Sequence, residues 1–383
     1  MLLKKIHIKN RSQFENVNLD LTYPEGHEKV GKPLNNICII GDNGTGKTAL
    51  LEWILQGYQK QASIPLFEHI HGAEYDDVGL SFQYSGNTTL KDNIFKLFYY
   101  SKGIDQLNLK ELQEKFDENA IRNSRDLGPH DVHRFIHDLT GGKEILRLWY
   151  EFRANLTQLS SDYLHDEYEK LAEVLNKILN KFHLELNSAI ELQKFRNLEF
   201  IELKAKEGTI LPTEKWSAGI KQLIYTILPL YHLRPQEGVI IIDEPESSLH
   251  PNTQHILIDF YKSVCPKMQL IFATHSPILA SSFEPWEVVD LQFNSNGKVE
   301  QRLYYEGENH VDNYKIYPMY LRWDSLLTNL FGVVGQSNDE RLKKLEELAI
   351  LDREMNLTED NAMKKELFKK YESIAEKLDW ATL

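Results

Sequence analysis

Cysteine is scarce in this chain of 383 residues: it has only Cys38 and Cys265, which lie far apart. No C-x-x-C pair occurs, which argues against a zinc-finger or zinc-hook element and favours a reducing compartment. No run approaches the roughly 18 apolar residues that a membrane-spanning helix needs. The opening residues, MLLKKIHIKNR, also lack the apolar stretch of a secretory signal. We therefore expect a cytoplasmic protein that does not bind membranes.

Positive charge is also in short supply. The 44 Lys and Arg residues face 57 Asp and Glu residues, which gives a net charge of −13. Wholesale non-specific binding of nucleic acid is disfavoured, because attraction to phosphate supplies most of that affinity. A local basic strip remains at Lys4, Lys5, Lys9 and Arg11, although a solvated strand edge is the simpler interpretation.

Glycine and proline are sparse between residues 104 and 196, where apolar residues recur at helical spacing. On either side, short apolar runs predict strands, among them a hairpin formed by residues 2–9 and 14–22. The end of the chain is highly charged and predicts a pair of helices at residues 340–351 and 359–379. We expect three parts: an α/β nucleotide-binding lobe of residues 1–103 and 197–310, an inserted helical lobe of residues 104–196, and a helical tail of residues 311–383 that could dock a partner.

A glycine-rich turn follows the buried strand at residues 37–40. It matches the P-loop pattern G-x-x-x-x-G-K-[ST], in which backbone N–H groups and a helix N-terminus surround phosphate. Its residues are Gly41, Asp42, Asn43, Gly44, Thr45, Gly46, Lys47 and Thr48. The Lys47 ammonium would reach the β- and γ-phosphates of ATP, and the Thr48 hydroxyl would ligate Mg²⁺.

A second apolar strand, residues 239–242, ends in two acids, Asp243 and Glu244. This is the Walker B arrangement, in which a buried strand delivers carboxylates to a nucleotide. Asp243 would enter the Mg²⁺ shell. Glu244 would stand beside the γ-phosphate and act as the general base that polarises the attacking water.

Between these two elements lies Ser217-Ala218-Gly219, directly before an amphipathic helix. A hydroxyl and an unobstructed backbone at a helix N-terminus form a second element that can bind phosphate. One site has a single γ-phosphate to hold. We therefore expect Ser217 and Gly219 to act on the ATP of a second chain.

In this order, the motifs resemble those of ABC-type ATPases. Ser217-Ala218-Gly219 resembles a degenerate ABC signature, and residues 246–251, which include Ser247, resemble the D-loop. The segment FATHSP resembles the switch-histidine segment, which implies that His275 touches the γ-phosphate. The resemblance implies a P-loop NTPase of the ABC-ATPase head type, α/β in fold, that dimerises head to tail around ATP and Mg²⁺. ABC proteins also carry a glutamine that joins the nucleotide to the helical lobe; neither Gln83 nor Gln106 is a clean match.

Three further stretches indicate a branch of the class. The opening KKIHIKNRSQFENVNLDL and the phrases DEPESSLHP and ATHSP resemble the RecF, RecN, SMC and OLD-type ATPases. The stretch DSLLTNLFG resembles the PtuA-like ATPases of antiphage defence, found in the Septu system and beside some retrons. That resemblance implies an oligomeric ATPase that holds an HNH nuclease. Because the residues after His275 lack the V-E-G…D-x-D pattern of OLD-type nucleases, the nuclease would be a separate chain.

The sequence therefore predicts an ATPase that hydrolyses ATP to ADP and phosphate, cleaves no DNA itself, and controls a partner effector in antiviral defence. DNA would be reached through that partner. A RecF-like repair ATPase that clamps DNA directly is the first alternative. A transporter ATPase subunit is the second, and the 169 residues between Thr48 and Ser217 (217 − 48) are too many for it.

Overall fold

The computed structural model describes residues 1–63, 75–76, 79–85, 95–115, 136–140, 142–188, 200–333 and 339–378. The chain forms two compact units, Met1–Leu326 and Leu327–Leu383. The first unit extends beyond residue 311, where the sequence placed the start of the tail. Its division into a nucleotide-binding lobe and an inserted helical lobe stays a prediction.

One large mixed sheet organises the first unit. Its described strands follow the order β4-β5-β1-β2-β14-β13-β3-β12-β11-β6-β7. They are β1 (Leu2–Arg11), β2 (Phe14–Asp20), β3 (Asn36–Gly41), β4 (Tyr75–Asp76), β5 (Leu80–Ser85), β6 (Phe95–Tyr100), β7 (Ile136–Asp138), β11 (Glu237–Asp243), β12 (Met268–Ala273), β13 (Val288–Phe293) and β14 (Val299–Arg302). A smaller sheet contains β8 (Leu184–Leu186), β9 (Leu203–Ala205) and β10 (Ile210–Leu211).

The middle of the large sheet is parallel. Strand β3 pairs with β12, β12 with β11, and β11 with β6, all in parallel. Their sequences, NICIIG, MQLIFA and EGVIIID for β3, β12 and β11, are almost continuously apolar and buried. Such runs are typical of strands covered on both faces. The sheet therefore brings the ends of β3, β12 and β11 to one edge.

The predicted N-terminal hairpin is confirmed. Strands β1 and β2 pair antiparallel, with Ile6 opposite Leu19 and Ile8 opposite Val17. Buried and exposed residues alternate along both strands, as expected where only one face of a sheet is covered. Strands β13 and β14 form a second antiparallel pair, with Asp290 opposite Arg302.

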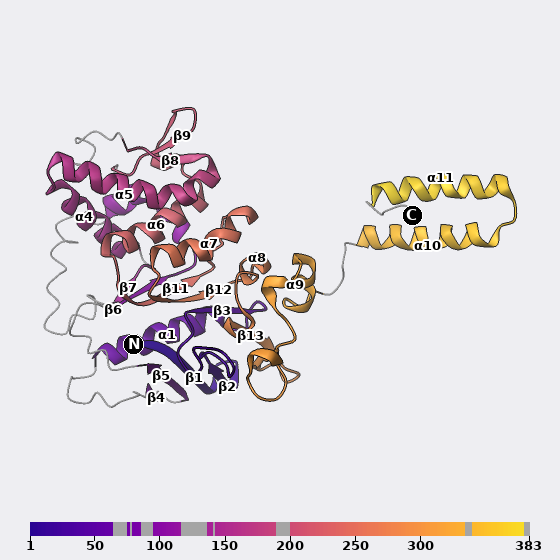
Figure 1. Ribbon diagram of the computed structural model, residues 1–383, viewed down its shortest axis with the longest axis horizontal. Coiled ribbons are helices and arrows are strands. Elements are labelled where there is room, and N and C mark those ends of the chain that lie inside the picture. Colours follow the sequence, from indigo (N-terminus) through magenta and orange to yellow (C-terminus); the bar gives the residue numbers. More distant parts are fainter. Residues whose placement is uncertain are drawn as a thin grey trace. The chain divides into compact units, whose positions relative to one another are not determined.

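Helix α1 (Lys47–Ser63) lies between two parts of this bent sheet, as Figure 1 shows. Its apolar residues share one core with residues of β1, β2 and β5 and with residues of β3, β11, β12 and β13. Leu50, Leu51 and Ile54 are almost fully buried there. Each contributes about 1.5–3 kcal/mol through burial. This packing fixes the start of α1, and with it the P-loop.

Further helices cover the other face of the parallel strands in Figure 1. They are α4 (Lys143–Thr157), α5 (Ser161–Leu179), α6 (Ala218–Leu233) and α7 (Pro251–Val264). Shorter helices are α2 (Leu109–Lys115), α8 (Pro277–Ala280) and α9 (Trp323–Asn329). The apolar stripe expected along α5 is buried at Leu164, Tyr168, Leu171 and Leu175. Strands β7 and β8 interrupt the range that the sequence predicted as helical.

The second unit contains the predicted helix pair, α10 (Asp339–Leu357) and α11 (Asn361–Lys377). Asp360 caps α11 by accepting a hydrogen bond from the Ala362 N–H. Buried leucines on both helices form a small core. Among the described residues of both units, no helix combines the length and the apolar character needed to cross a membrane.

Candidate nucleotide-binding site

Three predicted motifs meet at one edge of the sheet. The P-loop follows β3, Asp243 and Glu244 end or follow β11, and His275 follows β12. Because these strands are parallel neighbours, their ends lie side by side. The charges of Lys47 and Glu244 both influence the pKa of His275. The structure therefore brings together residues that are more than 200 positions apart in the sequence.

The P-loop turn requires glycine where the chain passes its neighbours. A side chain on Gly41 would place its Cβ 2.2 Å from the carbonyl oxygen of Leu291 on β13. Gly41, Gly44 and Gly46 all have positive φ angles. The Thr45 hydroxyl donates a 2.9 Å hydrogen bond to the Asp42 carbonyl and closes the turn. A turn of this kind can point successive backbone N–H groups at a phosphate group.

Lys47 is folded onto this loop. Its Nζ donates hydrogen bonds to the carbonyls of Gly41, at 2.8 Å, and Asp42, at 3.0 Å. Burial lowers the pKa of Lys47, and the negative charge of Asp243 opposes that shift. The ammonium is therefore held at the loop by weak carbonyl partners. A phosphate oxygen would replace them with a stronger, charge-assisted bond.

Thr48 and Asp243 are in direct contact. The Thr48 hydroxyl donates a 2.7 Å hydrogen bond to Asp243 Oδ2, which joins the P-loop to β11. Asp243 is almost fully buried, so burial raises its pKa, while the Thr48 hydrogen bond opposes the shift. A hydroxyl and a carboxylate so close together form the oxygen-rich ligand set that Mg²⁺ prefers.

Glu244 has an unusual backbone. Its φ angle is +51°, a left-handed conformation that is costly for a residue with a side chain. The Glu244 N–H donates to the Ala273 carbonyl at 2.8 Å. From α6, the buried Gln222 donates from Nε2 to the carbonyls of Glu244, at 3.2 Å, and Pro245, at 3.0 Å. These bonds hold the backbone around Glu244 in this conformation.

The Glu244 carboxylate has a partner that the sequence did not reveal. Lys102 Nζ donates to Glu244 Oε1 at 2.9 Å, and this bond raises the pKa of Lys102. The contact follows from register: Tyr100 pairs with Ile242, so the positions two residues further on, Lys102 and Glu244, lie level. The sequence shows a lysine just after β6, but its contact with Glu244 becomes apparent only from the pairing of β6 with β11.

Neither Gln83 nor Gln106, the two glutamines considered from the sequence, takes the place of Lys102 beside Glu244. Gln83 lies in β5, and β1, β2, β14 and β13 separate β5 from β3 in the sheet. Gln106 ends the short 3-10 helix Ile104–Gln106, a few residues past Lys102. The residue that reaches Glu244 from the segment after β6 is a lysine.

His275 is positioned through the buried Glu246. Glu246 Oε1 accepts hydrogen bonds from the Thr274 hydroxyl, at 2.5 Å, and the His275 N–H, at 3.1 Å. The His275 side chain itself stays exposed. Partial burial lowers its pKa, and the positive charge of Lys47 lowers it further. A neutral imidazole results near pH 7, which suits a hydrogen-bonding contact to phosphate.

Ser217 and Gly219 begin α6. The exposed Ser217 is its N-cap, and the hydroxyl accepts a 3.4 Å hydrogen bond from the Ile220 N–H. A side chain on Gly219 would place its Cβ 2.6 Å from the Ser248 carbonyl, so glycine allows α6 to approach the segment after β11. In that segment Ser247 donates its N–H to the Glu244 carbonyl. The signature segment is thereby linked to Glu244.

Comparison with protein families identifies the chain. The family model described as "AAA domain, putative AbiEii toxin, Type IV TA system" matches residues 37–281, which is more than half of the sequence. The chain belongs to this AAA family. The match begins within β3 and ends just after α8, so it spans the P-loop, Asp243 and His275.

A curated relative refines the position of this AAA protein. It is 24% identical over 314 residues to the Septu protein PtuA of Bacillus thuringiensis, covering 74% of this chain and 75% of PtuA. The AAA protein is thus an ABC-type ATPase that resembles PtuA, as its sequence predicted.

Solved structures of SMC heads were also matched. A crystal structure of an SMC head bound to the C-terminal winged-helix domain of ScpA has a TM-score of 0.41 and 12% identity, covering 79% of this chain and 97% of that one. The SMC head domain from Thermotoga maritima has a TM-score of 0.38 and 14% identity, with 79% and 99% covered.

Proposed function

We propose that this protein binds and hydrolyses ATP with Mg²⁺, and that two chains close around the nucleotide. The observation that carries the proposal is the 2.7 Å contact between Thr48 and Asp243, with Glu244 next in the chain. It joins the phosphate-binding loop to the acidic strand end. Thr48 and Asp243 would hold Mg²⁺, which would neutralise charge on the β- and γ-phosphates.

In this proposal Glu244 is the general base. Its carboxylate would accept a proton from the water that attacks the γ-phosphate. In the structure, Lys102 donates a hydrogen bond to one carboxylate oxygen of Glu244. A bound γ-phosphate would compete for the Lys102 ammonium and so free the carboxylate. His275 would then donate a hydrogen bond to the same phosphate group.

The second chain would complete the site with Ser217 and Gly219. Ser217 is exposed at the start of α6, so it can meet the nucleotide of another chain. Ser247, in the D-loop position, would lie near the seam between the two chains. Gln222 links α6 to the carbonyl of Glu244. The phosphate of the other chain's ATP, bound at the start of α6, would therefore act through Gln222 on the segment that contains Glu244.

The output we propose is control of an effector in antiviral defence inside the cytoplasm. The similarity to PtuA over three quarters of both chains supports this role. The effector would be a separate nuclease, with the HNH type favoured by that resemblance. DNA would then be reached through the nuclease.

The experiment is a capture from the native host that compares two tagged variants. Glu244→Gln holds the closed state and Lys47→Ala cannot reach it. A stoichiometric nuclease recovered with the tagged chain supports effector control. Comparing the amount recovered with each variant shows whether the closed or the open state binds the nuclease. Salt-sensitive DNA recovered without another protein would contradict the proposal and favour a RecF-like ATPase.

A further inference from the structure

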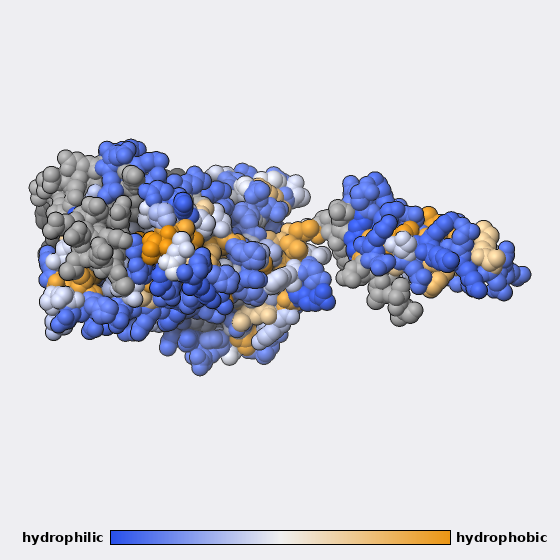
Figure 2. All heavy atoms as spheres, turned by 90° about the horizontal axis from the view of Figure 1, so that it is seen from above, coloured by the Kyte–Doolittle hydropathy of each residue, from blue (hydrophilic) through white to orange (hydrophobic). Residues whose placement is uncertain are grey.

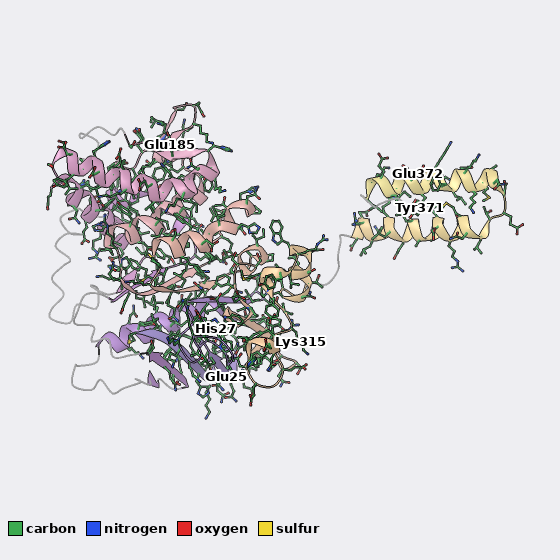
Figure 3. All side chains as sticks on the ribbon, in the orientation of Figure 1. Glu25, His27, Glu185, Lys315, Tyr371 and Glu372 are labelled. Carbon is green, nitrogen blue, oxygen red and sulfur yellow. The ribbon has the colours of Figure 1, made fainter. Side chains whose placement is uncertain are left out.

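Helix α10 has two apolar faces. On the first, Leu348, Leu351 and Met355 are buried against α11. Figure 3 places Tyr371 of α11 on the side toward α10 and Glu372 on the opposite side. This inner face accounts for the pairing of the two helices, and it uses one side of α10 only.

The second face of α10 is exposed. Leu342, Ile350 and Leu357 are 44%, 58% and 74% exposed, and Ala349 is exposed beside Ile350. At 100° per residue, these positions gather on the side of the helix opposite the buried face. Figure 2 views the helix pair from the side of α11 and shows a mainly hydrophilic surface with a few apolar patches, so the outer face of α10 is not seen in it. Pairing with α11 does not require a second apolar stripe on α10.

Two charged residues complete this outer face. Glu346 and Arg353 fall at its centre, between the apolar positions. Some other charges of the helix pair form local ion pairs, such as Lys343–Glu340 and Lys344–Glu347. Within the described residues, Glu346 and Arg353 form no ion pair. The outer face thus offers one free acid and one free base.

The outer face is self-complementary under a two-fold axis. Counting from the midpoint between Ala349 and Ile350, Glu346 and Arg353 are equally distant, and so are Leu342 and Leu357. An antiparallel second copy of α10 would therefore bring Glu346 level with the other copy's Arg353, twice. Leucine would meet leucine at both ends, and between the two ion pairs Ala349 of each copy would face Ile350 of the other. Isologous contacts need this symmetry.

We propose that two copies of this chain pair through the outer faces of α10, antiparallel, with two reciprocal Glu346–Arg353 ion pairs. We choose a second copy as the occupant because the face is complementary to itself: in the antiparallel arrangement each acid meets the other copy's base. Stability argues the same way: a unit this small buries few apolar residues alone, and back-to-back pairs form a four-helix arrangement. The contact needs no nucleotide.

Charge exchange tests the pairing in the full-length chain. All variants carry Lys47→Ala, so ATP-driven closure does not contribute, and association is measured by sedimentation without nucleotide. Glu346→Arg alone and Arg353→Glu alone should each weaken self-association by roughly tenfold, because like charges then meet twice. An equal mixture of the two variants should associate as tightly as the parent, because both pairs become opposite in charge.

A thiol at the centre gives the register. Both natural cysteines are buried, so Ala349→Cys adds an accessible thiol close to the two-fold axis. Mild oxidation should yield a disulfide-linked dimer, whereas Glu347→Cys, on another side of α10, should not. A monomeric parent, association unchanged by either charge variant, no recovery in the mixture, or equal cross-linking from both thiols would overturn the proposal. None of these results depends on ATP hydrolysis.

Discussion

Replacing Glu244 with glutamine is expected to slow ATP hydrolysis by about 10²–10⁴-fold while ATP binding is retained, because only the proton acceptor is lost. The amide keeps the size of the side chain, and the bonds from Gln222 and Ala273 that shape the Glu244 backbone involve main-chain atoms. The P-loop, Thr48 and Asp243 are unchanged. ATP should therefore bind and stay unhydrolysed, so the closed dimer should accumulate.

The matched control is Glu237→Gln at the exposed start of the same strand, β11. It removes one carboxylate without touching the site, and we expect hydrolysis close to that of the unaltered chain. Phosphate release gives the rate and size-exclusion chromatography in ATP gives the closed state. Equal turnover in Glu244→Gln and the unaltered chain would show that another group is the base.

Replacing Lys47 with alanine should act at an earlier step and weaken ATP binding by about 10- to 100-fold, the usual contribution of a hydrogen bond to a charged group. The hydrogen bonds of Lys47 to the part of the chain that the structure describes go to two loop carbonyls, those of Gly41 and Asp42. Its removal therefore leaves the fold largely intact but deprives the β- and γ-phosphates of their ammonium. Hydrolysis and closure should fail together.

Calorimetric titration with ATP measures this loss directly. Lys60→Ala, in the last turn of the same helix, is the control and should bind ATP normally. Thermal unfolding of both variants checks that α1 still packs in its core. An affinity for Lys47→Ala within twofold of the unaltered chain would remove Lys47 from the phosphate site.

Local patterns predicted much of the fold. The apolar runs around residues 37–40 and 239–242 became β3 and β11, because continuous burial leaves little choice of residue. The P-loop glycines were recognised from their spacing, and the Leu291 carbonyl beside Gly41 shows why a side chain has no room at that position. The hairpins and the final helix pair follow from alternation and helical spacing.

Contacts between distant segments could not be predicted this way. The bond between Lys102 and Glu244 depends on the register of β6 against β11, which no local pattern encodes. The same holds for Gln222, whose amide reaches the Glu244 carbonyl from α6. His275 was recognised from its motif, but the buried Glu246 that positions it was not.

The central claim is that each ATP is held by the P-loop of one chain and by Ser217 and Gly219 of another. Mixing two inactive variants tests it. Lys47→Ala removes the P-loop contribution. Ser217→Asp places a negative charge toward the phosphate while keeping a side chain that can cap α6. In a mixed dimer, one site combines the intact P-loop of the Ser217→Asp chain with the intact Ser217 of the Lys47→Ala chain.

The measurement is phosphate release by each variant alone and by their equal mixture. We expect little activity from either variant alone. The mixture should recover about a quarter of the activity of the unaltered chain, since half of randomly paired dimers are mixed and each has one intact site of two. Activity in the mixture no greater than the sum of the two separate variants would contradict a site shared between chains.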